Sequence, residues 1–176
     1  LAETMLAKWI LSSCGITIPT GPLVIVTHSQ GNTVRFKKSS KGWTISGLAK
    51  KVPWTSFAKG VVVIGCSGDT MIAALLNPGS YTINHGENLA GEPLDEVIFN
   101  NVEAGIENVK KVPEHIDESE LFLRGALTRI ALMGGALERV LDLTVQYAKE
   151  RTQFGRAIGR FQAVQQQLAV LAGEVT

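Results

Sequence analysis

The sequence predicts an α+β fold, in which an antiparallel β-barrel or β-sandwich lies between the end of one helical domain and the first helices of a second helical bundle. Apolar residues have helical spacing in residues 1–13, and this spacing returns from residue 117. Between these segments lies a series of short β-branched runs separated by turn residues. The expected domains are the end of the first helical domain (1–18), the β domain (19–116) and the start of the second helical domain (117–176).

The first helix is predicted by apolar residues at helical spacing, at Leu1, Met5, Leu6, Trp9 and Ile10. Glycines and prolines between positions 14 and 22 then end it. The first and last residues of the sequence both lie inside helical patterns. We therefore expect the chain to be a fragment of a longer protein.

The middle of the chain is predicted to be all β. Its short apolar runs are LVIV, TVRF, WTIS, VVVIG, MIAALL, YTIN and EVIF. Many short strands with regular turns are typical of an antiparallel sandwich or barrel. Because no long helical pattern interrupts the runs, a parallel nucleotide-binding sheet is not expected.

The overall composition is that of an ordinary globular protein. The 176 residues are 45% hydrophobic and 19% charged, with a net charge of +1, which argues against a nucleic-acid-binding protein. No apolar run is long enough to span a membrane. The cysteines and histidines have no metal-ligand spacing, and Cys14 and Cys66 are compatible with a reducing, cytoplasmic compartment.

Two helices are predicted after residue 117. The first has apolar residues at helical spacing, and the second is expected to begin near Arg160. Gly134 and Gly135 interrupt the first helix at a cost of about 1 kcal/mol each relative to alanine. This cost predicts close packing of a neighbouring helix or ligand there, with a simple kink as the alternative.

The segment Tyr147–Gln162 connects the two helices and reads YAKERTQFGRAIGRFQ. It combines a fixed cation, small polar groups, a glycine and two aromatic rings. Guanidinium groups bind phosphate well, and flat rings pack against flat cofactors. The alternative for Arg151 is a cation that stabilises the C-terminal end of a helix.

The run RTQFGRAIGRFQAVQQQLA resembles a segment of the acyl-CoA dehydrogenase family, in which Arg-x-x-Phe-Gly is followed by the glutamine-containing start of a helix. In that family this segment binds FAD, often the FAD held mainly by a neighbouring subunit. The resemblance therefore implies a homodimer or homotetramer in which Phe154 and Gly155 shape the turn. The implied FAD contacts are Arg151, Thr152, Gln153, Phe161 and Gln162.

The run GWTISGLAKKVPWTSFAKGVVVIG resembles the middle domain of the same family. The resemblance implies that Lys51, Val52 and Pro53 lie along the flavin ring, with Trp54 beside it. The alternative for Val52 and Pro53 is a hairpin edge, since proline cannot donate a hydrogen bond to a sheet. For Trp43, a place in the β core is the favoured interpretation.

The resemblance implies an oxidoreductase of fatty acid metabolism that performs α,β-dehydrogenation of an acyl-CoA thioester. An electron-accepting flavoprotein is the implied partner, and Arg124 is the implied contact to CoA. The family's acidic, glycine-containing loop is replaced here at Thr27–Thr33, where Thr27, Ser29 and Gln30 are candidate donors. Of two positions for the catalytic glutamate, one corresponds to Gly125 and the other lies in a later helix.

We therefore expect no catalytic residue in this chain and little or no turnover by it alone. Two alternative functions remain open from the sequence. One is a flavin oxidase or monooxygenase on the same scaffold, and the other is a non-catalytic structural subunit that has lost the cofactor.

Overall fold

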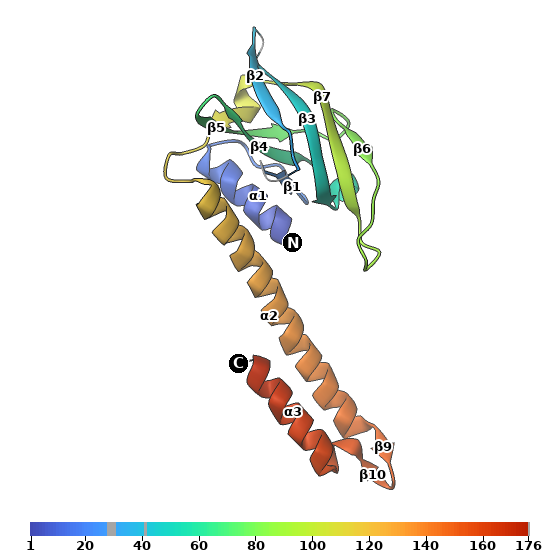
Figure 1. Cartoon of the computed structure of the whole chain (residues 1–176). Coiled ribbons are helices and arrows are strands. Elements are labelled where there is room, and N and C mark those ends of the chain that lie inside the picture. The colour runs from blue at the N-terminus through green and yellow to red at the C-terminus, as the bar shows by residue number, and fades with distance from the viewer. Residues whose placement is uncertain (28–30, 41, 176) are drawn as a thin grey trace. The chain divides into compact units, whose positions relative to one another are not determined.

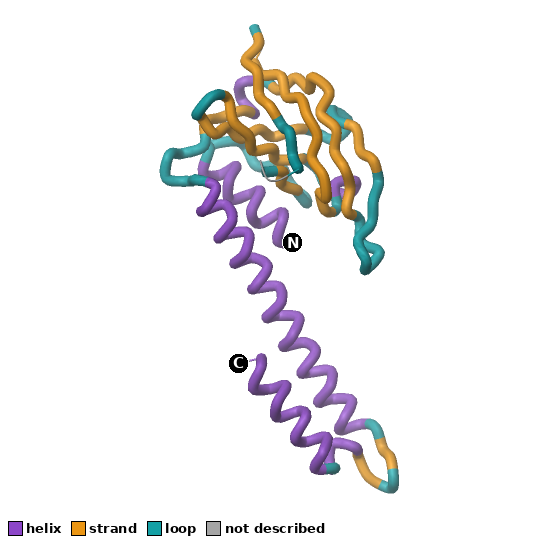
Figure 2. Tube along the Cα trace, viewed as in Figure 1, coloured by secondary structure: helices purple, strands orange, loops and turns teal. Residues whose placement is uncertain are grey.

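The computed structural model describes residues 1–27, 31–40 and 42–175. The chain divides into two compact units, Leu1–Gly125 and Ala126–Thr176. Strands dominate the first unit and helices the second (Figures 1 and 2). The alternation of strand and helix regions predicted from sequence is confirmed.

The first unit contains one eight-stranded sheet in the order β6-β7-β3-β2-β4-β5-β8, with β1 paired to β4. The order begins at β6 and ends at β8 without closing, so the sheet is an open, sandwich-like structure and not a barrel. The strands are β1 (Val24–Val26), β2 (Arg35–Ser39), β3 (Gly42–Pro53), β4 (Val61–Ser67), β5 (Thr70–Leu76), β6 (Thr82–Asn84), β7 (Leu94–Ala104) and β8 (Val109–Lys111).

Two of the strand pairings are parallel, whereas the sequence predicts an antiparallel sheet. β1 pairs with β4 through residues 61–63, and β2 pairs with β4 at Cys66. β1 and β2 lie one after the other along the same edge of β4, and both run in the direction of β4. β5 pairs with the other edge of β4 in the antiparallel direction. Both are therefore parallel to β4, and every other pairing in this sheet is antiparallel.

β4 is buried on both faces and divides the core of the first unit into two clusters. Val61 and Val63 belong to the cluster enclosed by the sheet. Val62 and Ile64 belong to the second cluster, between the sheet and a helix. Because alternate residues of a strand point to opposite faces, a strand covered on both sides is apolar at every position. This explains the uninterrupted run VVVI.

Helix α1 (Ala2–Ser13) covers the second cluster (Figure 1). Ile10 and Leu11 are fully buried there, and the same cluster includes Leu121, from the first turn of α2 (Glu118–Glu150). The Thr4 hydroxyl donates to the Leu23 carbonyl at 3.0 Å and accepts from the Leu23 N–H at 3.0 Å. These bonds fix α1 to the chain that leads into β1.

β3 and β7 form the longest strand pair and contain two irregularities in register, between Ile45 and Gly47 and between Ala49 and Val52. At the second one, Lys51 has a φ of +56°. Left-handed backbone is uncommon outside glycine, and it concentrates at functional sites. The bulge therefore marks the end of β3 as a candidate site.

The second unit holds the rest of α2, the hairpin β9 (Thr152–Gln153) and β10 (Arg156–Ala157), and α3 (Gln162–Val175). At the start of α2, Asp117 Oδ1 accepts a hydrogen bond from the Glu120 N–H at 2.8 Å, as an N-cap does. α2 continues as one helix through Gly134 and Gly135. A Cβ at either glycine would meet nothing within 4 Å, so no close neighbour among the described residues explains the two glycines.

The two cysteines differ in burial, which predicts different reactivity. Cys14 is partly buried after α1, and burial raises the pKa of its thiol to about 11, whereas Cys66 is exposed. At pH 8 only about one Cys14 in a thousand is then the reactive thiolate. We expect iodoacetamide to alkylate Cys66 at least ~10-fold faster, as measured by peptide mass spectrometry. In urea the two rates should converge, and equal rates in the folded protein would contradict this expectation.

Within the described residues, no helix combines the length and the apolar character that a membrane span requires.

Candidate cofactor-binding site

The predicted flavin-facing residues lie where β3 ends and turns into a short 3-10 helix, η1 (Thr55–Phe57). We call residues 51–57 the β3-end segment. Lys51 is exposed, Val52 is buried in the sheet core and Pro53 is partly buried. Of the three predicted contacts, Lys51 and Pro53 are therefore accessible, whereas the Val52 side chain is part of the fold.

Backbone contacts hold the β3-end segment on the first residues of β7. Val52 is in register with Asp95, and Pro53 with Leu94. The Trp54 N–H donates to the Pro93 carbonyl at 3.2 Å. Trp54 itself has left-handed backbone, with φ 59° and ψ 26°. Two left-handed, non-glycine residues therefore lie within four positions of one another, and each is a backbone conformation that costs free energy.

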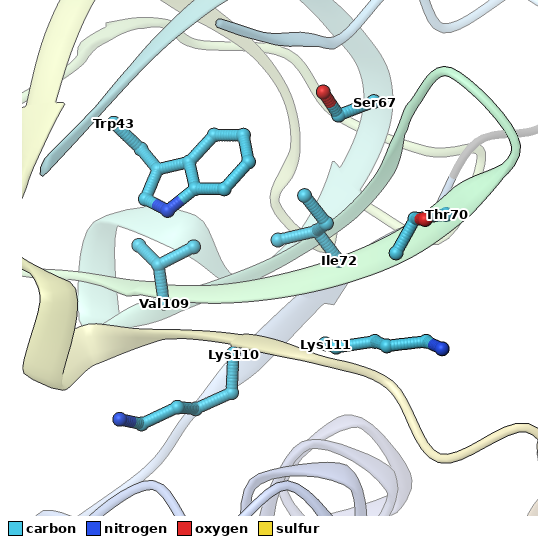
Figure 3. Close-up of a pocket in the computed structure, with 7 residues that line it drawn as sticks. All are labelled: Trp43, Ser67, Thr70, Ile72, Val109, Lys110 and Lys111. Carbon is cyan, nitrogen blue, oxygen red and sulfur yellow. The ribbon is translucent and has the colours of Figure 1, made fainter. Parts of the chain in front are cut away.

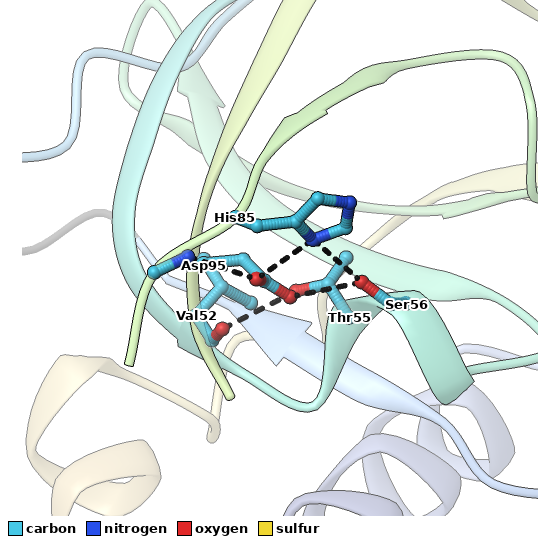
Figure 4. A network of polar contacts seen from close by, with 6 residues as sticks. Val52, Thr55, Ser56, His85 and Asp95 are labelled. Atoms are coloured by element: carbon cyan, nitrogen blue, oxygen red, sulfur yellow. Dashed lines mark hydrogen bonds and ion pairs between the residues drawn. The ribbon is translucent and has the colours of Figure 1, made fainter. Parts of the chain in front are cut away.

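A buried carboxylate, Asp95, lies at the centre of a polar network beside this segment (Figure 4). Its Oδ2 accepts from the Ser56 hydroxyl at 3.3 Å, and its Oδ1 accepts from the Gly86 N–H at 3.4 Å. His85 Nδ1 lies 3.4 Å from Asp95 Oδ1 and 3.2 Å from Ser56 Oγ. The network connects η1 to the loop between β6 and β7.

The β3-end segment presents two aromatic rings to solvent. Trp54 is 44% exposed and Phe57 is 62% exposed, and their ring centroids lie 5.7 Å apart. Exposed aromatic pairs are favourable surfaces for flat ligands. The family resemblance implies a flavin contact at Trp54 but not at Phe57. Phe57 joins the surface because the 3-10 turn places its ring beside that of Trp54.

The second group of predicted residues lies on the β9–β10 hairpin of the second unit. Gln153 pairs with Arg156, and Thr152 pairs with Ala157. Phe154 and Gly155 form the two-residue loop, with φ of +51° and +78°. Positive φ at both loop residues is the type I′ arrangement, which explains why glycine occupies the second position.

Arg151 directly follows α2, and its backbone is fixed on both sides. Its N–H donates to the Tyr147 carbonyl at 2.8 Å, and its carbonyl accepts from the Ile158 N–H at 2.8 Å. The side chain is exposed, and its guanidinium forms no ion pair or side-chain hydrogen bond within the part of the chain that the structure describes. It is therefore a positioned cation available to an anion.

The aromatic residues of the hairpin interact with one another. The rings of Phe154 and Phe161 meet edge-on at 6.2 Å, and the Arg156 guanidinium lies 4.2 Å above the Phe161 ring. Because the Arg156 guanidinium covers one face of the Phe161 ring, a cofactor on that face would contact Arg156 as well as Phe161. The motif did not identify Arg156, because the contact depends on the hairpin register. Gln162 is exposed at the first position of α3.

Comparison with known proteins finds relatives of the chain in sequence and in fold. Residues 119–176 match the family of the acyl-CoA dehydrogenase C-terminal domain. An L-prolyl-(peptidyl-carrier protein) dehydrogenase from a Serratia species is 35% identical over 103 residues, which are 52% of this chain and 26% of that protein. The probable acyl-CoA dehydrogenase YngJ of Bacillus subtilis is 26% identical over 178 residues, which are 94% of this chain and 46% of that protein.

The last third of the chain therefore resembles the C-terminal domain of acyl-CoA dehydrogenases, and nearly the whole chain is similar to one probable member of that family. The fold of the chain agrees: a glutaryl-CoA dehydrogenase from Mycobacterium smegmatis, solved in complex with FADH2, superimposes with a TM-score of 0.64 at 18% identity. The match covers 82% of this chain and 39% of that one. The chain spans less than half the length of each of these relatives.

Arg124, the CoA contact implied by the family resemblance, is already engaged within the first unit. Its guanidinium lies 4.2 Å above the Trp9 ring and forms an ion pair with Glu120. The side chain would have to leave these partners to reach a ligand. At Gly125, the implied alternative position of the family's glutamate, a Cβ would lie 3.8 Å from Leu6 Cδ2.

Part of the loop that replaces the family's acidic motif is described. Asn32 Nδ2 donates to the Thr27 carbonyl, and Asn32 Oδ1 accepts from the Lys50 N–H, both at 2.9 Å. These bonds fix the end of the loop to β3. Ser29 and Gln30, two of the predicted donors, lie outside the described residues.

A separate pocket of about 200 Å³ opens at the other end of β3 (Figure 3). Trp43 lines it from the margin of the sheet core, where its ring meets Phe36 edge-on at 6.4 Å. One of its lysines, Lys111, is paired with Glu114 at 2.9 Å. The pocket contains none of the predicted cofactor contacts. Among the described residues, no cluster of histidine, cysteine and acidic side chains is suited to a metal.

Proposed function

We propose that this protein is an FAD-dependent acyl-CoA dehydrogenase-like oxidoreductase. The observation that carries the proposal is the β9–β10 hairpin. It lies directly after the cation Arg151, which has no side-chain partner among the described residues, and it presents the exposed side chains of Thr152 and Gln153. The relative solved with FADH2 supports FAD as the cofactor. The predicted division into domains at residues 18 and 116 is part of the same proposal.

Each unit, taken by itself, presents residues that fit one chemical part of FAD. A guanidinium and nearby amide and hydroxyl groups suit a pyrophosphate, and the hairpin supplies these at Arg151, Thr152 and Gln153. A flat apolar surface suits the flavin ring, and the β3-end segment supplies one at Trp54 and Phe57. Phe161 and Gln162 add a ring and an amide at the start of α3.

The proposed reaction is α,β-dehydrogenation of an acyl-CoA thioester. When bound, FAD supplies the acceptor for the hydride that leaves the β-carbon, while a carboxylate takes the α-proton. Gly125 has no side chain to perform that step, so we propose that the carboxylate comes from the family's other position. Arg124 would bind CoA after release from Trp9 and Glu120.

The proposed partners follow from the same chemistry. Electrons left on the cofactor require an acceptor, and an electron-accepting flavoprotein in the cytoplasm is the proposed one. A homodimer or homotetramer would let the hairpin of one subunit contact the FAD of its neighbour.

The first test is FAD binding followed by reduction. We expect the protein, purified together with the later helix that carries the carboxylate, to bind FAD with a change in flavin absorbance. We expect added acyl-CoA to bleach the bound flavin of this protein under anaerobic conditions. The expectation is contradicted by the absence of FAD binding, or by flavin that stays oxidised with acyl-CoAs of every chain length. Rapid reoxidation by oxygen would instead identify an oxidase.

A second candidate is a non-catalytic subunit that has kept the fold without the cofactor. It is favoured by the sequence at Thr27–Thr33, which lacks the family's acidic loop. Protein purified without flavin absorbance, and unable to take up added FAD, would support this candidate.

A further inference from the structure

We propose that Asp95 is a positioning residue for the flavin surface: it holds the β3-end segment, and therefore Trp54 and Phe57, in the orientation that receives the ring. The inference rests on the proposed function, because the ring in question is that of FAD. Asp95 acts on the proposed flavin surface only through other residues. The observations that carry it are the burial of Asp95, its hydrogen bonds and the strained backbone that it anchors.

The hydrogens of the network can be assigned from the donors available. The Ser56 hydroxyl has one hydrogen and donates it to Asp95 Oδ2. His85 Nδ1 must then carry its own hydrogen, which it directs to Ser56 Oγ and Asp95 Oδ1. With the Gly86 N–H, all three donors converge on one carboxylate. His85 Nε2 takes no part in these contacts, so the Nδ1–H donor is present whether or not Nε2 carries a hydrogen.

A carboxylate is an unusual choice for this position. Asp95 is 1% exposed, and a buried charge is unfavourable unless hydrogen bonds compensate for lost hydration. Its neighbours on the same strand, Val97 and Phe99, are buried apolar residues, as expected for a strand that faces the core. A valine at position 95 would pack as they do, but it would hold neither Ser56 nor the loop at Gly86.

What the network holds is a conformation that the segment would not keep alone. Lys51 and Trp54 are both left-handed, at φ 56° and 59°, and such residues persist only where the surroundings impose them. Asp95 holds the chain on both sides of Trp54, through its backbone register with Val52 and through the hydrogen bond from Ser56 to its side chain. Thr55 adds a bond from its hydroxyl to the Val52 carbonyl at 3.3 Å. Loss of the carboxylate would let Trp54 and Phe57 reorient.

The experiment compares FAD binding and flavin spectra for four variants of the protein. Asp95→Leu removes every acceptor, and we expect at least ~10-fold weaker FAD binding with altered flavin absorbance. Asp95→Asn keeps an acceptor for the Gly86 N–H and should retain affinity within ~3-fold. Ser56→Ala removes the hydrogen bond from Ser56 to Asp95 at an exposed position, where misfolding is not expected. It should weaken FAD binding by a factor between those of Asp95→Asn and Asp95→Leu. Val97→Ala is the matched control, because it opens the same strand's core contacts without touching the network.

A second measurement separates this inference from the proposed function. With Trp9 and Trp43 replaced by phenylalanine, Trp54 is the remaining tryptophan, and its quenching by acrylamide reports the segment without FAD. We expect stronger quenching in Asp95→Leu and Ser56→Ala but not in Val97→Ala. A wild type that binds no FAD, with this quenching pattern intact, would overturn the proposed function and leave the anchoring role. FAD binding and quenching unchanged in Asp95→Leu and Ser56→Ala would overturn the inference.

Discussion

Replacing Arg151 with alanine is expected to weaken FAD binding by about 10- to 150-fold, which corresponds to about 1.5–3 kcal/mol. The guanidinium is exposed, it has no partner within the described residues, and its backbone is fixed on both sides. FAD binding would therefore not have to break an existing ion pair of Arg151, and the fixed backbone reduces the entropy lost when the side chain becomes ordered. Titration of the protein with FAD, followed by flavin fluorescence, measures the change.

The matched control is Arg139→Ala, which removes an exposed arginine from the same helix. It should leave FAD affinity unchanged, and it corrects for a general loss of positive charge. The effect of Arg151→Ala should also shrink as salt is added, since salt screens exposed charges. Identical titration curves for Arg151→Ala and wild type would leave Arg151 with only its helix-end role.

The hairpin shows what local sequence can and cannot predict. A break between two helices was predicted from Gly155 and the surrounding pattern, and the structure has α2 ending at Glu150 and α3 beginning at Gln162. The position of Arg156 above Phe161 was not predicted. That contact follows from the pairing of Gln153 with Arg156, and pairing register is not encoded in residue spacing.

The β3-end segment shows the same limit over a longer range. The family resemblance identified Lys51, Val52 and Pro53, but Asp95 lies more than forty positions later in the chain. Its role depends on the register of β3 with β7, and that register contains two irregularities. No pattern within either strand indicates where a bulge shifts the pairing, so the polar network was missed.

The long helix α2 differs from its predicted packing. Its apolar residues recur at helical spacing, which normally predicts a buried stripe. Leu127 and Ile130 are nevertheless 65% and 64% exposed. Spacing shows that a face is apolar, but it does not show which element covers that face. Together with the open surfaces at Gly134 and Gly135, this leaves α2 with an apolar surface that α3 does not bury.

Gly47→Ala is expected to lower the free energy of unfolding by about 2–5 kcal/mol, a large share of the stability of a typical domain. Gly47 lies at the first irregularity of β3 and has a φ of +137°, which side chains other than glycine rarely adopt. A Cβ there would lie 2.1 Å from the Thr33 carbonyl oxygen and 2.9 Å from Val34 Cα. Both are backbone atoms, so relief requires the chain before β2 to move away from β3.

The control for this effect is Gly79→Ala, which separates backbone strain from the clash. Gly79 also has a positive φ, +86°, but a Cβ there would meet nothing within 4 Å. Only the strain remains, and we expect a loss of about 1–2 kcal/mol. Urea unfolding, followed by circular dichroism, measures both variants. If the two variants lose equal stability, the contact with Thr33 contributes nothing. If Gly47→Ala loses more, the close approach of β3 to residue 33 explains why glycine occupies position 47.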